Sequence, residues 1–208
     1  MKIVAVATAR NEADIIEAFV RHNLAFCDAM IVLDHWSTDR TLTILKALQN
    51  EGLPLHVLKD RTQGYLQIVH MNKMIAMAVH DLCADWVVCL DADEIIQGEG
   101  MMALRELDPA TINSCLCIPL YHYVVQPGDD RNEINPLLRI THRLPRIPSS
   151  WTNYKAIVPG HVIRNNKTSI IGGNHTFVIN GFETSGVIYE GAWLNHFPSG
   201  NLVSMARK

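Results

Sequence analysis

The sequence predicts an α/β fold built on a parallel sheet with helices on both faces. Four short runs rich in valine, isoleucine and leucine occur in the first half, at residues 2–7, 30–33, 55–58 and 87–90. Continuous apolar runs are typical of strands that are buried on both faces. Segments with helical spacing separate the four runs, and this alternation indicates parallel strands joined by helical crossovers.

Start and stop signals place the helices between these strands. Asn11 is expected to cap a helix after the first strand. Ser37 and Asp39 stand before a second helix, which Gly52 and Pro54 end. A third amphipathic helix is expected over residues 65–82, directly before the fourth strand.

The second half is less regular, and glycine and proline concentrate after Asp108. Strands are expected near residues 116–121, 137–140, 161–164 and 169–171. No linker or internal repeat divides the chain, so we expect one domain over residues 1–208.

Composition excludes several classes of protein. The 208 residues are 48% hydrophobic and 19% charged, which excludes a disordered chain. A net charge of −3 offers no basic surplus for nucleic acid. No apolar run approaches the roughly 18 residues of a membrane span. The five cysteines form no CxxC pair, so we expect buried thiols in a reducing, cytoplasmic compartment.

Polar clusters follow three of the four strands, at residues 8–12, 34–39 and 91–94. In parallel α/β sheets, ligands bind beyond the carboxyl ends of the strands. We therefore expect the three clusters to meet at one edge of the sheet.

Asp91 and Asp93 form the cluster with the clearest chemistry. At a strand end, their spacing aims both carboxylates the same way, and two adjacent carboxylates repel unless a cation lies between them. Oxygen ligands suit Mg²⁺ or Mn²⁺. A site with only two carboxylates leaves coordination positions for substrate phosphates, so it predicts a ligand made of a metal and a diphosphate. The alternative is a solvated acidic turn. Asp34 is expected to face a ribose or base, whereas Asn11 and Asp39 also have a helix-capping interpretation.

The motifs 9–12, 34–41 and 85–94, in this order, resemble the nucleotide-binding half of glycosyltransferase family 2 over roughly residues 1–100. The resemblance implies the GT-A fold: a Rossmann-like nucleotide-binding half, a mixed central sheet and helices on both faces. Residues 1–100 would form the nucleotide-sugar-binding half, and residues 101–208 the acceptor-side half.

The resemblance also implies site residues. Those expected to bind the donor are Thr8, Ala9, Asn11, Glu12, Asp34, Asp39, Asn72 and Asp91. Asp91 and Asp93 would be the DxD pair that holds the metal and carries catalysis. The tail at residues 194–199 resembles a family motif whose histidine, His196, would be a third metal ligand, with His175 as second candidate. Arg207 and Lys208 would reach the diphosphate, and the chain ends there, which suggests an incomplete C-terminal part of the site.

The sequence also departs from the family pattern. Trp36 and Arg40 stand where the family usually has glycine, which puts the base preference in doubt. The ED pair and the QxxRW run of processive synthases are absent, so a membrane-embedded synthase is not expected. Four histidines are interpreted as structural: His22, His56, His70 and His80.

These features together predict a glycosyltransferase of hexosyltransferase type that depends on Mn²⁺ or Mg²⁺. It would move a sugar from a UDP- or GDP-linked donor to a glycan or other hydroxyl acceptor, with inversion at the sugar carbon. Glu183 and Glu190 are the candidate catalytic bases, and Glu133 is the next candidate. Two alternatives stay open: a GT-A module that binds a nucleotide or glycan without catalysis, and a sugar nucleotidyltransferase, whose usual glycine-rich phosphate loop is missing after the first strand.

Overall fold

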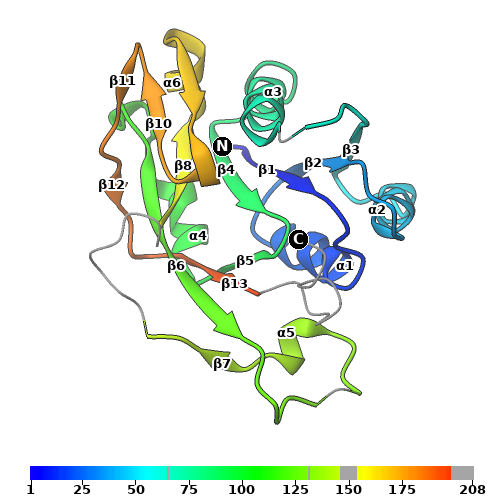
Figure 1. Cartoon of the computed structure of the whole chain (residues 1–208). Helices are drawn as coiled ribbons and strands as arrows, with labels where there is room; N and C mark the ends of the chain where they lie inside the picture. Colours follow the sequence, from blue (N-terminus) through cyan, green and yellow to red (C-terminus); the bar gives the residue numbers. More distant parts are fainter. Residues whose placement is uncertain (65, 131, 146–153, 198–208) are drawn as a thin grey trace.

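The structure is a computed structural model that describes residues 1–64, 66–130, 132–145 and 154–197. Its first half confirms the predicted alternation of strands and helices (Figure 1). The four predicted strands run parallel in the order β3-β2-β1-β4. Their bounds are β1 (Ile3–Ala9), β2 (Ala29–His35), β3 (Leu55–Asp60) and β4 (Trp86–Asp91).

Helices cover both faces of this parallel part, because alternate residues of each strand face opposite sides. In β1, Ile3 and Ala5 pack in one core with α1 (Ile16–Asn23) and α2 (Thr41–Asn50). Val4 and Val6 pack in the other core with α3 (Gln67–His80). All four β1 side chains are fully buried, which explains the continuous apolar run.

The second half makes the sheet mixed. The central order continues from β4 through β8, β6 and β13 to β5. β8 pairs antiparallel with both β4 and β6, whereas β13 runs parallel to β6 and antiparallel to β5. The bounds of these strands are β5 (Glu94–Gln97), β6 (Leu116–Val124), β8 (Tyr154–Pro159) and β13 (Trp193–His196).

Smaller elements complete the described parts of the chain. β7 (His142–Arg143) and β12 (Val187–Ile188) pair with β6. A separate sheet holds β9 (Thr168–Ile170), β10 (Phe177–Ile179) and β11 (Phe182–Glu183). The short helical elements are α4 (Gly100–Ala103), η1 (Leu104–Glu106), η2 (Pro109–Thr111), α5 (Pro136–Arg139), α6 (Gly160–Asn165) and η4 (Gly172–Asn174).

Two strand predictions in the second half are wrong. Residues 137–140 belong largely to helix α5, because the side chain of Asn135 accepts a hydrogen bond from the amide of Leu137 and Pro136 occupies the first turn. Residues 161–164 lie in helix α6, and the strand β8 ends just before them at Pro159. The strand near 116–121 is confirmed and longer than expected, and β9 confirms the one near 169–171.

No helix within the described ranges is long and apolar enough to cross a membrane. All five cysteines are free thiols, and Cys27, Cys89 and Cys115 are buried.

Candidate functional site

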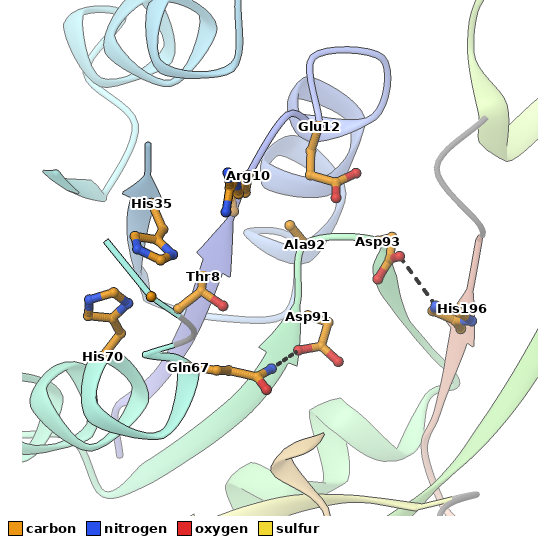
Figure 2. A pocket seen from close by; sticks show the side chains of 12 residues that line it. Thr8, Arg10, Glu12, His35, Gln67, His70, Asp91, Ala92, Asp93 and His196 are labelled. Carbon is orange, nitrogen blue, oxygen red and sulfur yellow. Dashed lines mark hydrogen bonds and ion pairs between the residues drawn. The ribbon is translucent and has the colours of Figure 1, made fainter. Parts of the chain in front are cut away.

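The three predicted clusters meet at the carboxyl edge of the parallel strands. The Cα register pairs Thr8 of β1 with Leu33 of β2 and with Asp91 of β4, and pairs Ala9 with Asp34. A cavity of about 450 Å³ opens at this edge (Figure 2). Twelve residues from the strand ends, α3 and β13 line it: Thr8, Ala9, Arg10, Glu12, His35, Gly64, Gln67, His70, Asp91, Ala92, Asp93 and His196.

The loop after β1 is held by side chains of the loop after β2. The backbone amide of Asn11 donates to Ser37 Oγ at 3.0 Å, that of Glu12 to Thr41 Oγ1 at 2.8 Å, and that of Ala13 to Asp39 Oδ2 at 3.1 Å. Three consecutive amides are thereby occupied within the protein. None of them is left to hold a phosphate in the way a phosphate-binding loop does.

This bracing corrects the capping interpretation of Asn11. Helix α1 has Ile15 at its N-cap position and no side-chain cap. Asn11 adopts a φ of 57°, a conformation that asparagine tolerates better than most residues, and its Oδ1 accepts a hydrogen bond from the amide of Thr38 at 2.8 Å. Asp39 also accepts from the amide of Thr41, the first residue of α2. Asn11 and Asp39 therefore hold the two loops together, and neither lines the cavity.

Two histidines lie at one end of the cavity. The rings of His35 and His70 meet edge to face with centroids 4.7 Å apart. His70 Nε2 lies 2.7 Å from Asp60 Oδ2. Hydrogen bonds from Thr62 and then from His70 hold the pKa of Asp60 below its usual range. His70, which the sequence suggested was structural, is in fact both buried and part of the cavity lining.

The carboxylate of Asp91 is bound by three side chains of the protein. Gln67 Nε2 and Asn174 Nδ2 donate to Oδ1 at 3.0 and 2.9 Å. Lys155 Nζ donates to Oδ2 at 2.5 Å. A carboxylate oxygen accepts about two hydrogen bonds in its plane, so the protein itself satisfies Oδ1 and half of Oδ2.

Lys155 and Glu94 form a buried ion pair below this carboxylate. Their Nζ and Oε1 atoms lie 2.9 Å apart, and each side chain is only 2% exposed. Burial alone lowers the pKa of Lys155, but the charges of Glu94 and Asp91 outweigh burial and raise that pKa above its usual value. Burial and the charge of Asp91 raise the pKa of Glu94, and the adjacent Lys155 ammonium group opposes this rise by favouring the ionised carboxylate.

Asp93 faces His196 at the other end of the cavity (Figure 2). His196 Nε2 lies 3.3 Å from Asp93 Oδ2, and its Nδ1 lies 3.1 Å from Nδ1 of His122. Burial lowers the pKa of His196, but the hydrogen bond and charge of Asp93 outweigh burial and raise it. The backbone also joins the two segments, because the amide of Phe197 donates to the carbonyl of Asp93 at 2.9 Å.

Of the predicted site residues, the structure brings Thr8, Ala9, Glu12, Asp91, Asp93 and His196 to the cavity. Asp34 is buried beside it, and its Oδ1 accepts no hydrogen bond from any described residue. Asn72 bridges α3 to β9: its Oδ1 accepts from the amide of Ile170 at 2.9 Å, and its Nδ2 donates to Ser169 Oγ at 3.1 Å.

The other candidates lie elsewhere. Glu183 is exposed on β11, Glu190 is exposed between β12 and β13, and Glu133 lies in the loop before α5. None of the three lines the cavity. His175 bonds through Nδ1 to the carbonyl of Tyr154 at 2.6 Å, and burial lowers its pKa. The predicted sites at Arg207 and Lys208, and the end of the tail motif at residues 198–199, lie outside the described residues.

Sequence reasoning missed Gln67, Lys155 and Asn174. Gln67 is the first residue of α3, the helix that follows β3. Because ligands bind beyond the carboxyl ends of parallel strands, its position after β3 was a signal that could have identified it. Lys155 is a charged residue near the start of the otherwise largely apolar strand β8. A lysine buried in such a strand requires a charged or polar partner, and this was a signal that could have identified it. Asn174 carries no comparable signal.

Comparison with solved structures identifies the fold. S. aureus TarS superimposes with a TM-score of 0.65 at 18% identity, over 95% of this chain and 37% of that chain. TarS 1-349 in complex with UDP gives 0.57 at 17% identity, over 94% of this chain and 60% of that one. Glucosyl-3-phosphoglycerate synthase from Mycobacterium tuberculosis, in complex with Mn²⁺, UDP and glucosyl-3-phosphoglycerate, gives 0.50 at 17% identity, over 99% and 76%. The protein therefore has the GT-A fold of glycosyltransferases.

Residues 5–106 match the family described as Glycosyl transferase family 2. This match agrees with the family resemblance that the three motifs indicate. It spans less than two thirds of either TarS chain. No curated protein sequence matches it.

Proposed function

We propose that the cavity binds a UDP- or GDP-linked sugar and that the protein transfers this sugar to a hydroxyl acceptor. The convergence of the three strand-end clusters on one cavity carries the proposal. The fold supports it, because structures similar to this one are described as complexes with UDP. The cavity volume of about 450 Å³ also falls within the range of small-molecule sites.

The two ends of the cavity suit the two ends of a nucleotide sugar. His35 is partly exposed and offers aromatic surface of the kind that packs against a base, and the buried ring of His70 meets it edge to face. Arg10 is exposed at the rim, where it would be a cation for the phosphates. Asp93 and His196 lie at the opposite end, where the diphosphate and the sugar would lie.

Asp93 and His196 fit a divalent cation in their donor chemistry. Among the described residues, no three His, Cys, Asp or Glu side chains are grouped to hold a metal by protein ligands alone. Mg²⁺ commonly binds to one or two carboxylates and completes its shell with water and substrate phosphates, so one carboxylate with one imidazole suits a metal that arrives with the donor. Mn²⁺ or Mg²⁺ bound there would neutralise charge on the departing diphosphate. The glucosyl-3-phosphoglycerate synthase complex, described with Mn²⁺ and UDP, supports this assignment.

The protein's own groups would orient the donor. Thr8 and Ala9 line the cavity at the end of β1, and hydrogen bonds to Ser37, Asp39 and Thr41 hold the adjacent loop in place. Rigid positioning of a bound reactant lowers the entropic part of the barrier.

Inversion at the sugar carbon, which the family resemblance supports, requires a base on the acceptor side. Glu183→Gln and Glu190→Gln test the two sequence-based candidates. Both side chains are exposed and outside the cavity lining, so we expect each variant to keep at least about half of the wild-type rate. A loss of tenfold or more in transfer, at unchanged donor affinity, would identify that glutamate as the base.

The nucleotidyltransferase alternative conflicts with the loop after β1. Its consecutive amides at Asn11, Glu12 and Ala13 already donate to side chains, whereas a phosphate-binding loop presents such amides to the ligand. Hydrolysis or transfer of the donor sugar distinguishes an enzyme from the alternative of a non-catalytic binding module.

The test combines calorimetry and turnover. We expect UDP or GDP to bind more tightly in the presence of Mn²⁺ than in the presence of a chelator. Asp93→Asn should lower the ratio of these two affinities at least tenfold. Asp81→Asn, an exposed change at the end of α3, is the matched control. Binding without hydrolysis or transfer of the donor sugar would favour the binding module, and pyrophosphate release from a nucleoside triphosphate would favour the nucleotidyltransferase. Binding of neither nucleotide would refute the proposal.

A further inference from the structure

The ammonium group of Lys155 contacts both Asp91 and Glu94, although Lys155 comes from the second half of the chain. Strand β8, which carries it, pairs with β4, whose last residue is Asp91. We propose that Lys155 is a positioning residue: its ammonium group is a built-in cation for Asp91 and leaves Asp93 as the carboxylate available to a donor-bound metal. This inference rests on the proposed function.

The ammonium group of Lys155 binds atoms of the protein and has no donor left for a ligand. An ammonium group has three N–H donors. Nζ lies 2.5 Å from Asp91 Oδ2, 2.9 Å from Glu94 Oε1 and 2.8 Å from the carbonyl oxygen of Gly173. All three donors are therefore used, and the side chain is 2% exposed. Lys155 acts on the cavity only through its partners.

The same contacts set Asp91 and Asp93 apart. Both lone pairs of Asp91 Oδ1 accept hydrogen bonds, from Gln67 and Asn174, and Lys155 takes one of the two on Oδ2. Asp93 contacts His196, whose Nε2 lies at the longer distance of 3.3 Å from Asp93 Oδ2. Both carboxylates line the cavity. A metal that replaced Lys155 at Asp91 would have to displace a buried ammonium group, whereas at Asp93 it would displace only the longer contact with His196.

Glu94 extends the effect of Lys155 to the turn between the two aspartates. Its Oε2 accepts from the backbone amide of Asp91 at 2.9 Å, while its Oε1 faces Lys155. The lysine thus fixes both ends of the turn that carries Asp93. Hydrogen bonds to the residues around a metal-binding side chain orient that side chain.

Removing Lys155 alone would leave the buried Glu94 carboxylate without a cation, and the variant could then fail to fold. The double variant E94Q/K155M removes both buried charges and retains an oxygen for the amide of Asp91. Asp91 then loses its cation but keeps Gln67 and Asn174. Asn174→Ala is the matched control, because it removes a neutral hydrogen bond from the same carboxylate and leaves Lys155 in place.

The first experiment measures Mn²⁺ affinity in the presence of UDP, from the electron paramagnetic resonance signal of free Mn²⁺. In the otherwise wild-type protein, we expect Asp93→Asn to weaken Mn²⁺ binding at least tenfold and Asp91→Asn to change it less than threefold. In the E94Q/K155M background, where Asp91 is released, Asp91→Asn should weaken binding at least fivefold. An equal loss for Asp91→Asn and Asp93→Asn in the wild type, or an unchanged small effect of Asp91→Asn in E94Q/K155M, would overturn the inference.

A second experiment needs neither metal nor nucleotide, so it separates this inference from the proposed function. The shift in urea midpoint caused by Asp91→Asn is compared between E94Q and E94Q/K155M. We expect a larger shift where Lys155 is present, because only there does the substitution break an ion pair. Equal shifts would overturn the role of Lys155 even if Mn²⁺ and UDP bind. Absence of Mn²⁺ and UDP binding with unequal shifts would refute the proposed function and leave the Lys155–Asp91 pair established.

Discussion

Substituting Lys155 with methionine should destabilise the protein by about 3–5 kcal/mol, the usual cost of breaking a buried ion pair from one side. The structure explains why the cost falls in this range. Lys155 and Glu94 are each 2% exposed, so methionine would leave the Glu94 carboxylate buried without its cation. The three hydrogen bonds of the ammonium group would be lost as well.

This loss is large compared with the whole stability of a domain, which is about 5–15 kcal/mol. For a chain of this length, each kcal/mol shifts the melting temperature by about 2–4 °C, so Lys155→Met should lower it by roughly 6–20 °C. Urea unfolding followed by circular dichroism gives the free energy directly.

The double variant E94Q/K155M should recover most of this loss, to within about 2 kcal/mol of wild type, because neither buried charge then remains unpaired. Asp91 keeps its bonds to Gln67 and Asn174, and its side chain is 32% exposed, so water can solvate it in part. A cost below about 1 kcal/mol for Lys155→Met would refute the reasoning. So would a double variant that is as unstable as the sum of the two single variants.

Three further predictions concern backbone space, thiols and pH. Gly160→Ala should cost about 1–3 kcal/mol in unfolding free energy, because a Cβ there would lie 2.1 Å from the carbonyl oxygen of Ala84. Cys83 is exposed, whereas Cys27, Cys89 and Cys115 are buried and Cys117 is partly buried, so Cys83 should react first with a thiol reagent in the native state. Because the pKa of Asp60 is held below its usual value of about 3.9, the folded protein binds fewer protons there than the unfolded chain. Stability should therefore fall as the pH drops below about 4, and Asp60→Asn should reduce that fall.

Each of these predictions has its own control. Gly128→Ala meets no atom within 4 Å and should leave the melting temperature nearly unchanged, so an equal loss in both glycine variants would contradict the steric argument. Cys83→Ser should remove the fast phase of thiol reaction, and a fast phase that persists would place the reactive thiol elsewhere. Urea titrations of wild type and Asp60→Asn from pH 3 to pH 7 test the last prediction, and parallel curves would contradict it.

The fold of the first half could be predicted because its signals are local. A continuous apolar run such as residues 2–7 reports burial on both faces, and the helices between such runs leave few topologies open. The same reasoning failed at residues 137–140 and 161–164, where short apolar runs have no length or period to separate a helix from a strand. At residues 137–140, Pro136 and the capping Asn135 decided the outcome.

The sequence by itself determined where the candidate site lies. Residues that follow parallel strands must meet at one edge, so Thr8 and Asp91 became neighbours once the strand order was set. The tertiary structure alone decided the electrostatic state of that edge. Asp91 and Lys155 are 64 residues apart, and the lysine reaches the carboxylate only because β8 returns antiparallel beside β4. Ion pairs between distant segments depend on a few ångströms of placement, which local patterns along a chain do not encode.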